Sequence, residues 1–521
     1  MTDLSRRTVF SSLAAAGLAG LVPAGALAQM GNPSPGAQQP RFGFNDVVKR
    51  ARDLAAAPFA KDQPLPDALE KLDFDAWRDI RFRPDKAFFS NGGFRLQTMH
   101  LGHLYKRPVV VNIVRDGIAT PIPYAANLFD YGRSKFDKPL PVNLGFAGFR
   151  LHYPLNDPKV LDELISFVGS SYFRVLGRGQ RYGLSARALA VSAGTNAEEF
   201  PFFREFWIET PAAATDHATI YGLLDGASVT GAYRFDVYPD VDSVVEVTAT
   251  VFTRRPDVKL GLAPLTSMYF QGETDRRMPL DFRRELHDSD GLLMHAGNGE
   301  WLWRPLKNPQ VMEISSFTDN NPRGFGLMQR DRTFEHYQDL DLNYELRPSY
   351  WIEPRENWGE GRVELIELPT TDETNDNIVA SWTMKEPLEP GKAFSYGYRI
   401  TSTMNGVRHS PGGRAMHTYQ TQPRALGSNE PLVPGTRRFI IDFAGGDLAF
   451  FQSAPHMIEV VPSALNGVVT RSFIVPNPYI KGFRAAFDVK AEPGKIVNLR
   501  AFLRTGGRVL TETWTYPWLA E

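Results

Sequence analysis

Short runs of β-branched and aromatic residues dominate this 521-residue chain from Ala87 onward, and they constrain its fold more than any other feature. Val, Phe, Tyr and Thr favour strands, whereas the Gly, Pro, Asn and Asp between the runs favour turns. Closely spaced short runs are typical of large antiparallel β-sandwiches. In the first part of the chain we predict strands at Arg107–Val114, Gly148–Tyr153, Glu205–Glu209, Gly231–Tyr238, Ser243–Thr253, Gly361–Glu367, Asn377–Thr383 and Phe394–Thr403.

A second group of β runs follows a stretch rich in Gly and Pro, Gly406 to Gly427, which has little apolar periodicity and is typical of a connecting segment. The size and rhythm of the later runs are typical of an immunoglobulin-like sandwich. We therefore predict an all-β protein with a large sandwich over residues 42–402, a linker over 403–427 and a second sandwich over 428–521. The later runs are Arg438–Phe443, Met457–Val461, Gly467–Val475, Gly482–Val489, Ile496–Arg504 and Arg508–Tyr516.

Two helices are predicted before the strands begin. Apolar residues recur at helical spacing from Asn45, a plausible cap, to Ala57, and again from Asp67 to Asp79. We expect no other substantial helix in the chain.

The N-terminus has the pattern of a twin-arginine export signal. Arg6-Arg7 precedes an Ala/Gly/Leu-rich run, and Ala26-Leu27-Ala28 offers a cleavage site, so residues 1–28 are a predicted signal peptide and 29–41 a spacer. The alternative is one membrane span over Val9 to Ala28, which Pro23 and the modest hydrophobicity disfavour. The mature protein is therefore expected in the periplasm without a membrane span, and the absence of cysteine fits export of an already folded chain.

The charge balance and several missing motifs exclude whole classes of function. Lys and Arg total 58 against 59 Asp and Glu, a formal net charge of -1, so no basic footprint indicates nucleic acid. The chain lacks a G-x-S-x-G elbow, an H-E-x-x-H motif, a phosphate-binding loop and cysteine. Asp288-Ser289-Asp290-Gly291 starts like a calcium loop, but the ligand pattern stops there. We expect no cofactor and no metal.

Chemistry-bearing residues gather between Leu286 and Asp376. This stretch has carboxylates at both ends and Trp, Arg, Asn and Tyr between them. Carboxylates transfer protons, aromatic faces stack on sugar rings and amides bind hydroxyls, so the mixture predicts a carbohydrate site. A neutral polymer also fits the charge balance.

Several long motifs in one order resemble the periplasmic glucan biosynthesis proteins G and D, and the resemblance covers essentially the whole mature chain. The twin-arginine signal resembles the D type rather than the G type. The motifs are Phe42–Phe44, Ser171–Arg187, Phe203–Trp207, His287–Gly291, Gly297–Trp301, Thr318–Pro322 and Glu373–Val379.

The resemblance implies a galactose-mutarotase-like sandwich, an immunoglobulin-like domain and action on β-1,2-linked glucan. D-type proteins resemble inverting endo-acting glucanases, some of whose relatives transfer the chain instead. On matching positions, Asp376 would be the general acid, Asp288 the general base, and Tyr344 would lend its hydroxyl to the proton path. The other motif residues are assigned only to sugar binding.

An inverting site requires one protonated and one ionised carboxyl group. Asp372, Glu373 and Asp376 form an acidic cluster that would raise the pKa of one member, and Arg347, Arg355 or His287 would keep Asp288 ionised. The alternatives are an ordinary polar loop at residues 372–376 and a turn-capping role for Asp288.

Sugar-binding candidates surround the two carboxyl groups. Trp301 and Trp303 share one face of an extended segment, so both lie in the cleft or both are buried. We expect the cleft for Trp301 and Trp351, and count Trp358 as a further candidate platform. The remaining candidate sugar-binding residues are Arg347, Arg355 and Glu373.

Three functions remain open on this sequence. The first is a β-1,2-glucan-cleaving or chain-transferring enzyme, and the second is a non-catalytic factor that binds and assembles glucan, with the membrane glucan synthase as a possible partner. The third, a lyase or epimerase acting on another polysaccharide, rests only on analogy of fold.

The signal peptide gives the first testable prediction. Replacing Arg6-Arg7 with Lys-Lys should leave the precursor in the cytoplasm, because a receptor reads the paired arginines and not merely their charge. Separation of periplasmic and cytoplasmic fractions, followed by detection of the protein in each, measures its export. Normal export of the Lys-Lys variant would indicate the general secretory route.

Overall fold

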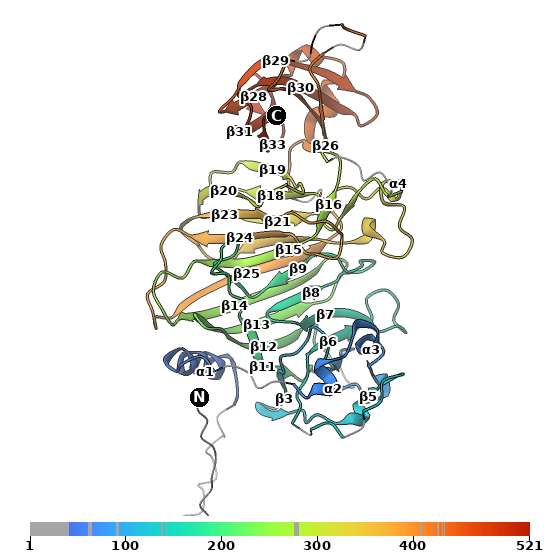
Figure 1. Ribbon diagram of the computed structural model, residues 1–521, viewed down its shortest axis with the longest axis vertical. Coiled ribbons are helices and arrows are strands. Elements are labelled where there is room, and N and C mark those ends of the chain that lie inside the picture. Colours follow the sequence, from blue (N-terminus) through green and yellow to red (C-terminus); the bar gives the residue numbers. More distant parts are fainter. Residues whose placement is uncertain are drawn as a thin grey trace, which may run out of the picture. The chain divides into compact units, whose positions relative to one another are not determined.

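The computed structural model describes residues 41–60, 65–89, 93–136, 139–141, 143–275, 281–406, 409–424, 427–429, 431 and 433–521. The predicted signal peptide, and the predicted spacer except Arg41, lie outside these residues. Strands dominate the described chain, so the prediction of an all-β sandwich protein is confirmed (Figure 1). Strands β6, β14 and β25 have the predicted bounds, and most of the others begin or end within a few residues of them.

A ten-stranded sheet forms one layer of the large sandwich. Its strands follow the order β2-β6-β7-β8-β9-β15-β24-β23-β20, and β10 also pairs with β15. Their pairing is antiparallel throughout. The bounds are β2 Arg95–Met99, β6 Gly148–Tyr153, β7 Asp162–Val168, β8 Tyr172–Val175, β9 Ser185–Arg187, β10 Leu189–Val191, β15 Leu260–Ser267, β20 Glu313–Asn320, β23 Glu360–Glu367 and β24 Ile378–Met384.

A fifteen-stranded sheet forms the opposite layer, in the order β28-β31-β33-β19-β18-β21-β22-β25-β14-β13-β12-β11-β3-β4, with β32 paired to β31. Its bounds are β3 Val110–Arg115, β4 Ile118–Pro121, β11 Phe202–Glu209, β12 Ala218–Asp225, β13 Val229–Tyr238, β14 Ser243–Thr253, β18 Gly291–His295, β19 Trp301–Pro305, β21 Gly324–Met328, β22 Ser349–Pro354, β25 Phe394–Thr403, β28 Glu459–Leu465, β31 Ile496–Thr505, β32 Arg508–Val509 and β33 Thr513–Leu519.

The main hydrophobic core lies between these two sheets. Phe167 and Phe173 of the ten-stranded sheet pack against Phe235 of the fifteen-stranded sheet, with ring centroids 5.0 and 5.2 Å apart. Alternation along β8 turns Phe173 and Val175 into this core and leaves Tyr172 and Arg174 on the other face. The sandwich thereby presents polar residues of β8 away from its core.

The C-terminal strands share the large sheet. β33 pairs in parallel with β19, and a second core contains residues from both regions, including Trp303 and Trp514. Residues Phe42–Glu521 form one compact unit by their contacts. The sequence boundary near residue 402 stays a prediction. The opposing four-stranded sheet has the order β26-β27-β30-β29, with β26 Arg414–Thr421, β27 Thr436–Ala444, β29 Val468–Asn477 and β30 Gly482–Lys490.

Strand β26 lies inside the segment that we predicted to be a linker, so residues 414–421 of that segment form part of the four-stranded sheet. Only Ala415 and Thr418 of this strand are buried, which explains why it shows little apolar periodicity. The backbone N–H of Thr418 donates to Glu273 at 2.7 Å, and the imidazole of His417 pairs with the same carboxylate. These bonds fix β26 against the large sandwich.

The helical predictions are correct for one helix and wrong for the other. Helix α1, Phe44–Ala56, buries Val47 and Ala51. Its N-cap is Gly43, whose N–H donates to Asp46 at 2.8 Å, and the predicted cap Asn45 lies inside the helix. The predicted second helix is two short helices, α2 Asp67–Glu70 and α3 Phe74–Arg78. Asp73 separates them, because its carboxylate accepts from Ala76 N–H and caps α3.

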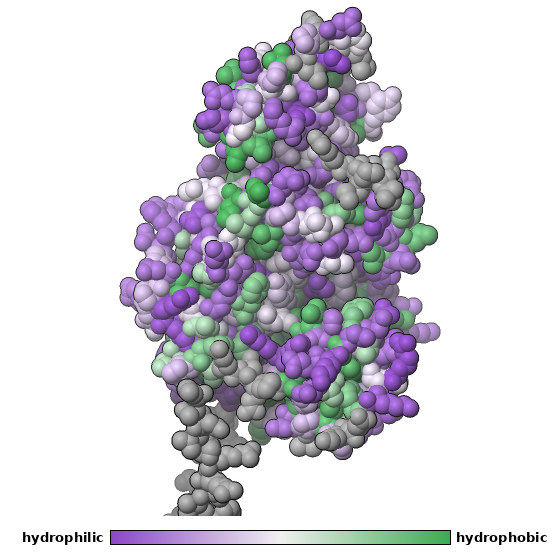
Figure 2. Space-filling model, viewed as in Figure 1, coloured by the Kyte–Doolittle hydropathy of each residue, from purple (hydrophilic) through white to green (hydrophobic). Residues whose placement is uncertain are grey.

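The remaining elements are short. They are β1 Arg81–Phe82, β5 Phe129–Asp130, β16 Tyr269–Gln271, β17 Leu286–His287, α4 Phe334–Tyr337, and the 3₁₀ turns η1 Pro84–Lys86, η2 Ala126–Leu128, η3 Tyr344–Leu346, η5 Gly446–Phe451 and η6 Pro455–Met457. Within the described part of the chain, no helix has the length and apolar character needed to cross a membrane. Hydrophilic side chains cover most of the face in Figure 2, with hydrophobic residues in separate patches.

The shared second core generates a stability prediction. Trp303→Ala should lower the free energy of unfolding by about 3–5 kcal/mol, because the ring is buried and the guanidinium of Arg330 packs on it. Urea unfolding measures the change. Val311→Ala, at a position 69% exposed, is the control and should change the value by less than about 0.5 kcal/mol. Equal stability of the two variants would contradict this packing.

Candidate functional site

Asp288 lies in the turn between β17 and β18, with its side chain buried. Its backbone N–H donates to Met268 O at 2.8 Å, which fixes the turn. Its carboxylate forms an ion pair with the guanidinium of Arg347. Of the three basic residues expected to keep Asp288 ionised, Arg347 is the partner that the fold supplies. Gly183 allows this arrangement, because a Cβ atom there would lie only 2.8 Å from the Arg347 side chain.

Tyr344 lies under the same guanidinium. The Arg347 guanidinium carbon is 3.7 Å from the Tyr344 ring centroid, a cation–π contact. The Tyr344 hydroxyl donates to Glu373 Oε2 at 3.1 Å, and burial raises the pKa of Tyr344 well above its usual range. Asp288, Arg347, Tyr344 and Glu373 therefore form one continuous polar chain.

Arg283 holds the loop that carries Glu373. One guanidinium nitrogen lies 2.8 Å from Glu373 and 3.0 Å from Asp339, and the rest of the group binds Asp281. One arginine thus joins segments from three different parts of the sequence. The loop position follows from this ion pair rather than from its own secondary structure.

Asp376 lies at the end of that loop, immediately before β24. Its neighbour Asn377 anchors the loop: the amide accepts from Tyr269 N–H at 2.8 Å and donates to Leu368 O at 2.9 Å. Although the Asp376 side chain reaches solvent, surrounding protein limits its hydration and raises the pKa of this carboxyl group. The charge of Arg174 opposes that increase, the charge of Asp288 adds to it, and Arg347 opposes it.

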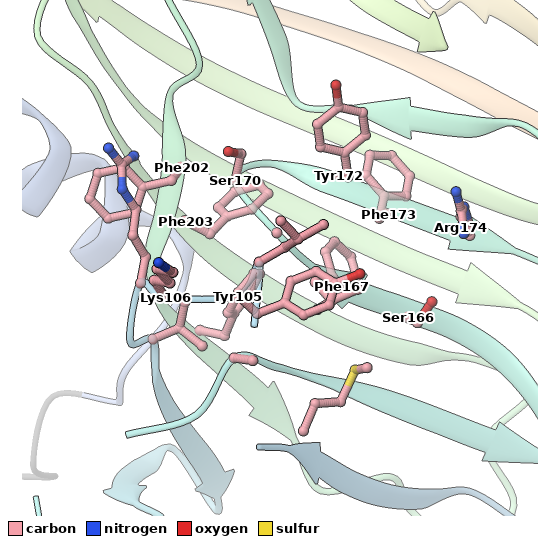
Figure 3. Close-up of a pocket in the computed structure, with 18 of the residues that line it drawn as sticks. Tyr105, Lys106, Ser166, Phe167, Ser170, Tyr172, Phe173, Arg174, Phe202 and Phe203 are labelled. Carbon is pink, nitrogen blue, oxygen red and sulfur yellow. The ribbon is translucent and has the colours of Figure 1, made fainter. Parts of the chain in front are cut away.

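A cavity of about 580 Å³ extends from Asp376 along β7 and β8 and reaches the core residues Phe167 and Phe173. Figure 3 shows Lys106 and Phe202 at one end of the cavity and Arg174 at the other. Among the described residues, no side chain accepts a hydrogen bond from the Arg174 guanidinium, which lies 5.9 Å from the Tyr182 ring. The cavity is also lined by polar and aromatic residues that suit a sugar chain, namely Tyr105, Glu163, Ser166, Ser170, Tyr172 and Tyr182.

The structure does not bring the predicted tryptophan platforms to this cavity. Trp351 is 3% exposed in the second core, and Trp301 stacks on it with centroids 5.7 Å apart. Trp303 belongs to the same core, so Trp301 and Trp303 do share a face, but it faces the C-terminal strands. Trp351 is covered by protein, and a covered ring cannot stack on a sugar. Trp301 is half-buried and lines a different cavity, beside Ser410 and Thr513, so its role as a platform stays a prediction.

Trp358 and Arg355 also lie elsewhere. Trp358 is buried in the main core beside Trp382 and Tyr396. Arg355 is half exposed and lies 3.4 Å from Glu246. Of the predicted sugar-binding residues, Arg347 and Glu373 join the Asp288 and Tyr344 cluster.

The expected cause of the raised carboxyl pKa also needs correction. Hydrogen bonds from Thr374 lower the pKa of Asp372, which is exposed. Instead, the pKa of Asp376 is raised by surrounding protein that limits its hydration and by the negative charge of Asp288. The acidic run in the sequence therefore indicated the loop that carries Asp376, but the neighbouring carboxylates of that run are not what raises its pKa.

Sequence reasoning missed Arg283 as an anchor and did not single out Arg174. The signal for Arg174 was present, because Tyr172-Phe173-Arg174-Val175 alternates polar and apolar residues and so places Arg174 outside the core. No local pattern marks Arg283, whose partners lie up to ninety residues away in sequence.

One cluster has the donor atoms for a metal ion. Ligand atoms of Glu285, Asp331 and His336 lie within 4.8 Å of one another. His336 already pairs with Asp331, and Glu285 accepts from His287 at 2.8 Å. Protein hydrogen bonds thus already occupy these donor atoms.

Comparison with known proteins shows which family the chain belongs to. Residues 42–518 match the family described as periplasmic glucan biosynthesis protein, MdoG. The chain is 46% identical over 486 residues to glucans biosynthesis protein G of Ralstonia nicotianae, covering 91% of this chain and 95% of that protein. It is 42% identical over 488 residues to the probable glucans biosynthesis protein D of Shewanella oneidensis, covering 92% and 89%. The chain therefore belongs to the MdoG family of periplasmic glucan biosynthesis proteins.

Proposed function

We propose that this protein acts in the periplasm on the β-1,2-linked backbone of glucans during their biosynthesis, as an inverting endo-glucanase or a transglycosylase. The observation that carries the proposal is the pairing of two carboxyl groups in opposite environments. Asp288 is buried and held by Arg347, whereas the Asp376 side chain reaches solvent and the protein packed around it raises the pKa of its carboxyl group. An inverting glycosidase requires this difference between base and acid.

In the proposed reaction, protonated Asp376 donates its proton to the glycosidic oxygen as the bond to the anomeric carbon breaks. Water attacks that carbon from the opposite face and loses a proton. The Tyr344 hydroxyl, released from its hydrogen bond to Glu373, accepts this proton and passes its own proton to Asp288. The proton given by Asp376 is thus balanced by the one that Asp288 gains. In transfer, a sugar hydroxyl replaces the water.

The cavity beside Asp376 supports binding of a glucan chain. Along β7 and β8 the cavity presents aromatic rings that can stack on sugar rings, and hydroxyl or charged groups that can bind sugar hydroxyls. Arg174 presents free N–H donors beside the proposed acid. We assign Arg174, Tyr172 and Tyr182 to substrate binding in place of the buried tryptophans.

Assignment to the D type and export by the twin-arginine pathway rest on Arg6-Arg7. Contact with the membrane glucan synthase is a further proposal.

One observation favours a second candidate function, a non-catalytic factor that binds and assembles glucan. Asp288 is 4% exposed and already paired, so water reaches its carboxylate only if Arg347 moves. Incubation of the mature protein with linear β-1,2-glucan, followed by chromatography, separates the two. Shorter or rearranged chains support the enzyme, and bound but unchanged glucan supports the assembly factor.

Substitution of the two carboxyl groups tests their roles. Asp376→Asn and Asp288→Asn should each lower kcat on β-1,2-glucan by about 10²–10⁴-fold, because neither amide can transfer the required proton. Glucan binding should survive in both, since asparagine has nearly the size of aspartate and the other residues that line the cavity are unchanged. Asp372→Asn is the matched control in the same loop and should retain most activity, because Asp372 bonds Thr374 and Asn375 of its own loop and does not line the cavity. Wild-type turnover by Asp376→Asn would show that Asp376 is not the acid.

The pH dependence gives an independent prediction. A general acid must be protonated, so kcat should fall as pH rises through the raised pKa of Asp376. Arg174→Leu removes the positive charge that lowers this pKa, and should move the alkaline limb of the kcat profile to higher pH by on the order of one unit. Arg115→Leu, at an exposed arginine on β3, should leave the limb in place. A shift to lower pH in Arg174→Leu would contradict the assignment.

A further inference from the structure

His287, buried directly before Asp288, has hydrogen bonds at both ring nitrogens. Nε2 lies 2.8 Å from Glu285 Oε2, and Nδ1 lies 2.8 Å from Gln329 Oε1. Carboxylate and amide oxygens only accept hydrogen bonds, so both ring nitrogens carry protons and His287 is a cation. Burial opposes this charge, but the hydrogen bond and the charge of Glu285 outweigh it and raise the pKa of His287 to about 9.

The His287 cation fixes the orientation of the Gln329 side chain. Because Oε1 accepts from His287, the amide nitrogen faces the other way. It lies 2.9 Å from His287 O, 2.9 Å from the Tyr337 hydroxyl and 3.3 Å from Tyr344 O. The Gln329 backbone N–H donates to Ser349 Oγ at 2.9 Å, and the residue is 2% exposed. In this orientation the two N–H groups of the Gln329 amide face three oxygen acceptors, and the reverse orientation would place its carbonyl oxygen against two backbone carbonyl oxygens.

This one amide joins the two segments that carry the proposed base and proton relay. His287 O belongs to the peptide bond that leads into Asp288. Tyr344 O belongs to the first residue of η3, the turn that also positions Arg347. The Asp288–Arg347 ion pair also joins these segments through side chains, and Leu286 and Tyr344 share a small hydrophobic cluster. Gln329 is not among the residues that line the cavity, so its bonds to the two segments lie outside the proposed substrate-binding surface.

We infer that Gln329 is a positioning residue that holds Asp288 and Tyr344 in register through the backbone carbonyl groups of residues 287 and 344, with His287 fixing its orientation. The kinetic part of this inference rests on the proposed function. Gln329 does not touch the substrate. Its effect should therefore appear in the chemical step rather than in glucan binding.

Gln329→Met tests the inference, since methionine has similar length and volume but makes none of these hydrogen bonds. We expect kcat on β-1,2-glucan to fall about 10- to 100-fold, because displacements near 1 Å have effects of this size. KM should change by less than about twofold. Asn112→Leu is the matched control: Asn112 is a buried amide on β3 that bonds Glu205 and Phe206 at 2.9 Å, and its loss should leave kcat unchanged. An equal fall of kcat in both variants, or a change confined to KM, would overturn the inference.

Amide hydrogen exchange of the same variants tests whether Gln329 couples the two segments, and this measurement does not require catalytic activity. In Gln329→Met, exchange should accelerate about tenfold or more in both residues 286–289 and residues 344–347, while Asn112→Leu should accelerate neither. Acceleration in only one segment, or in none, would show that Gln329 does not couple them. If wild-type protein fails to cleave or transfer β-1,2-glucan, the proposed function fails, yet the exchange result still decides whether Gln329 holds the two segments together.

Discussion

The buried ion pair between Asp288 and Arg347 is the interaction on which the rest of the site depends. Removing both charges from water is costly, so such a pair persists only where geometry and further contacts compensate. Here the Tyr344 ring lies under the guanidinium, and Gly183 leaves room beside it. Loss of one partner would leave an uncompensated buried charge, a cost of about 3–5 kcal/mol. The same contacts that stabilise the pair also place Tyr344.

The site is assembled from segments that are distant in sequence, and long-range contacts set its geometry. Arg283 ties the Glu373 loop to the segment before β17, and Asn377 ties Asp376 to Tyr269. Behind the site, Arg330 pairs with Glu512 of the C-terminal region, while its backbone N–H donates to Asp290 at 2.8 Å. Arg330 therefore connects Glu512, in the segment before β33, to Asp290, which lies two residues from Asp288.

Local sequence pattern predicted the strands well and the side-chain surroundings poorly. Runs such as Ser243–Thr253 carry enough Val, Thr and Phe to define a strand, but β26 has too few buried positions to reveal itself. The sequence also predicted that Trp301 and Trp303 share a face. Which layer that face meets depends on the pairing of β19 with β33, about two hundred residues later. Likewise, only the folded chain distinguishes Arg347 from the other candidate partners of Asp288.

The central claim is that Asp376 and Asp288 act as acid and base in an inverting displacement. The most direct test is proton NMR of β-1,2-glucan during the first minutes of cleavage, before the new reducing ends equilibrate. The proposed mechanism predicts that the new anomeric signal appears first in the α configuration, because water attacks the face opposite the β-linkage. First appearance of the β configuration would indicate retention and contradict the proposed roles of the two carboxyl groups.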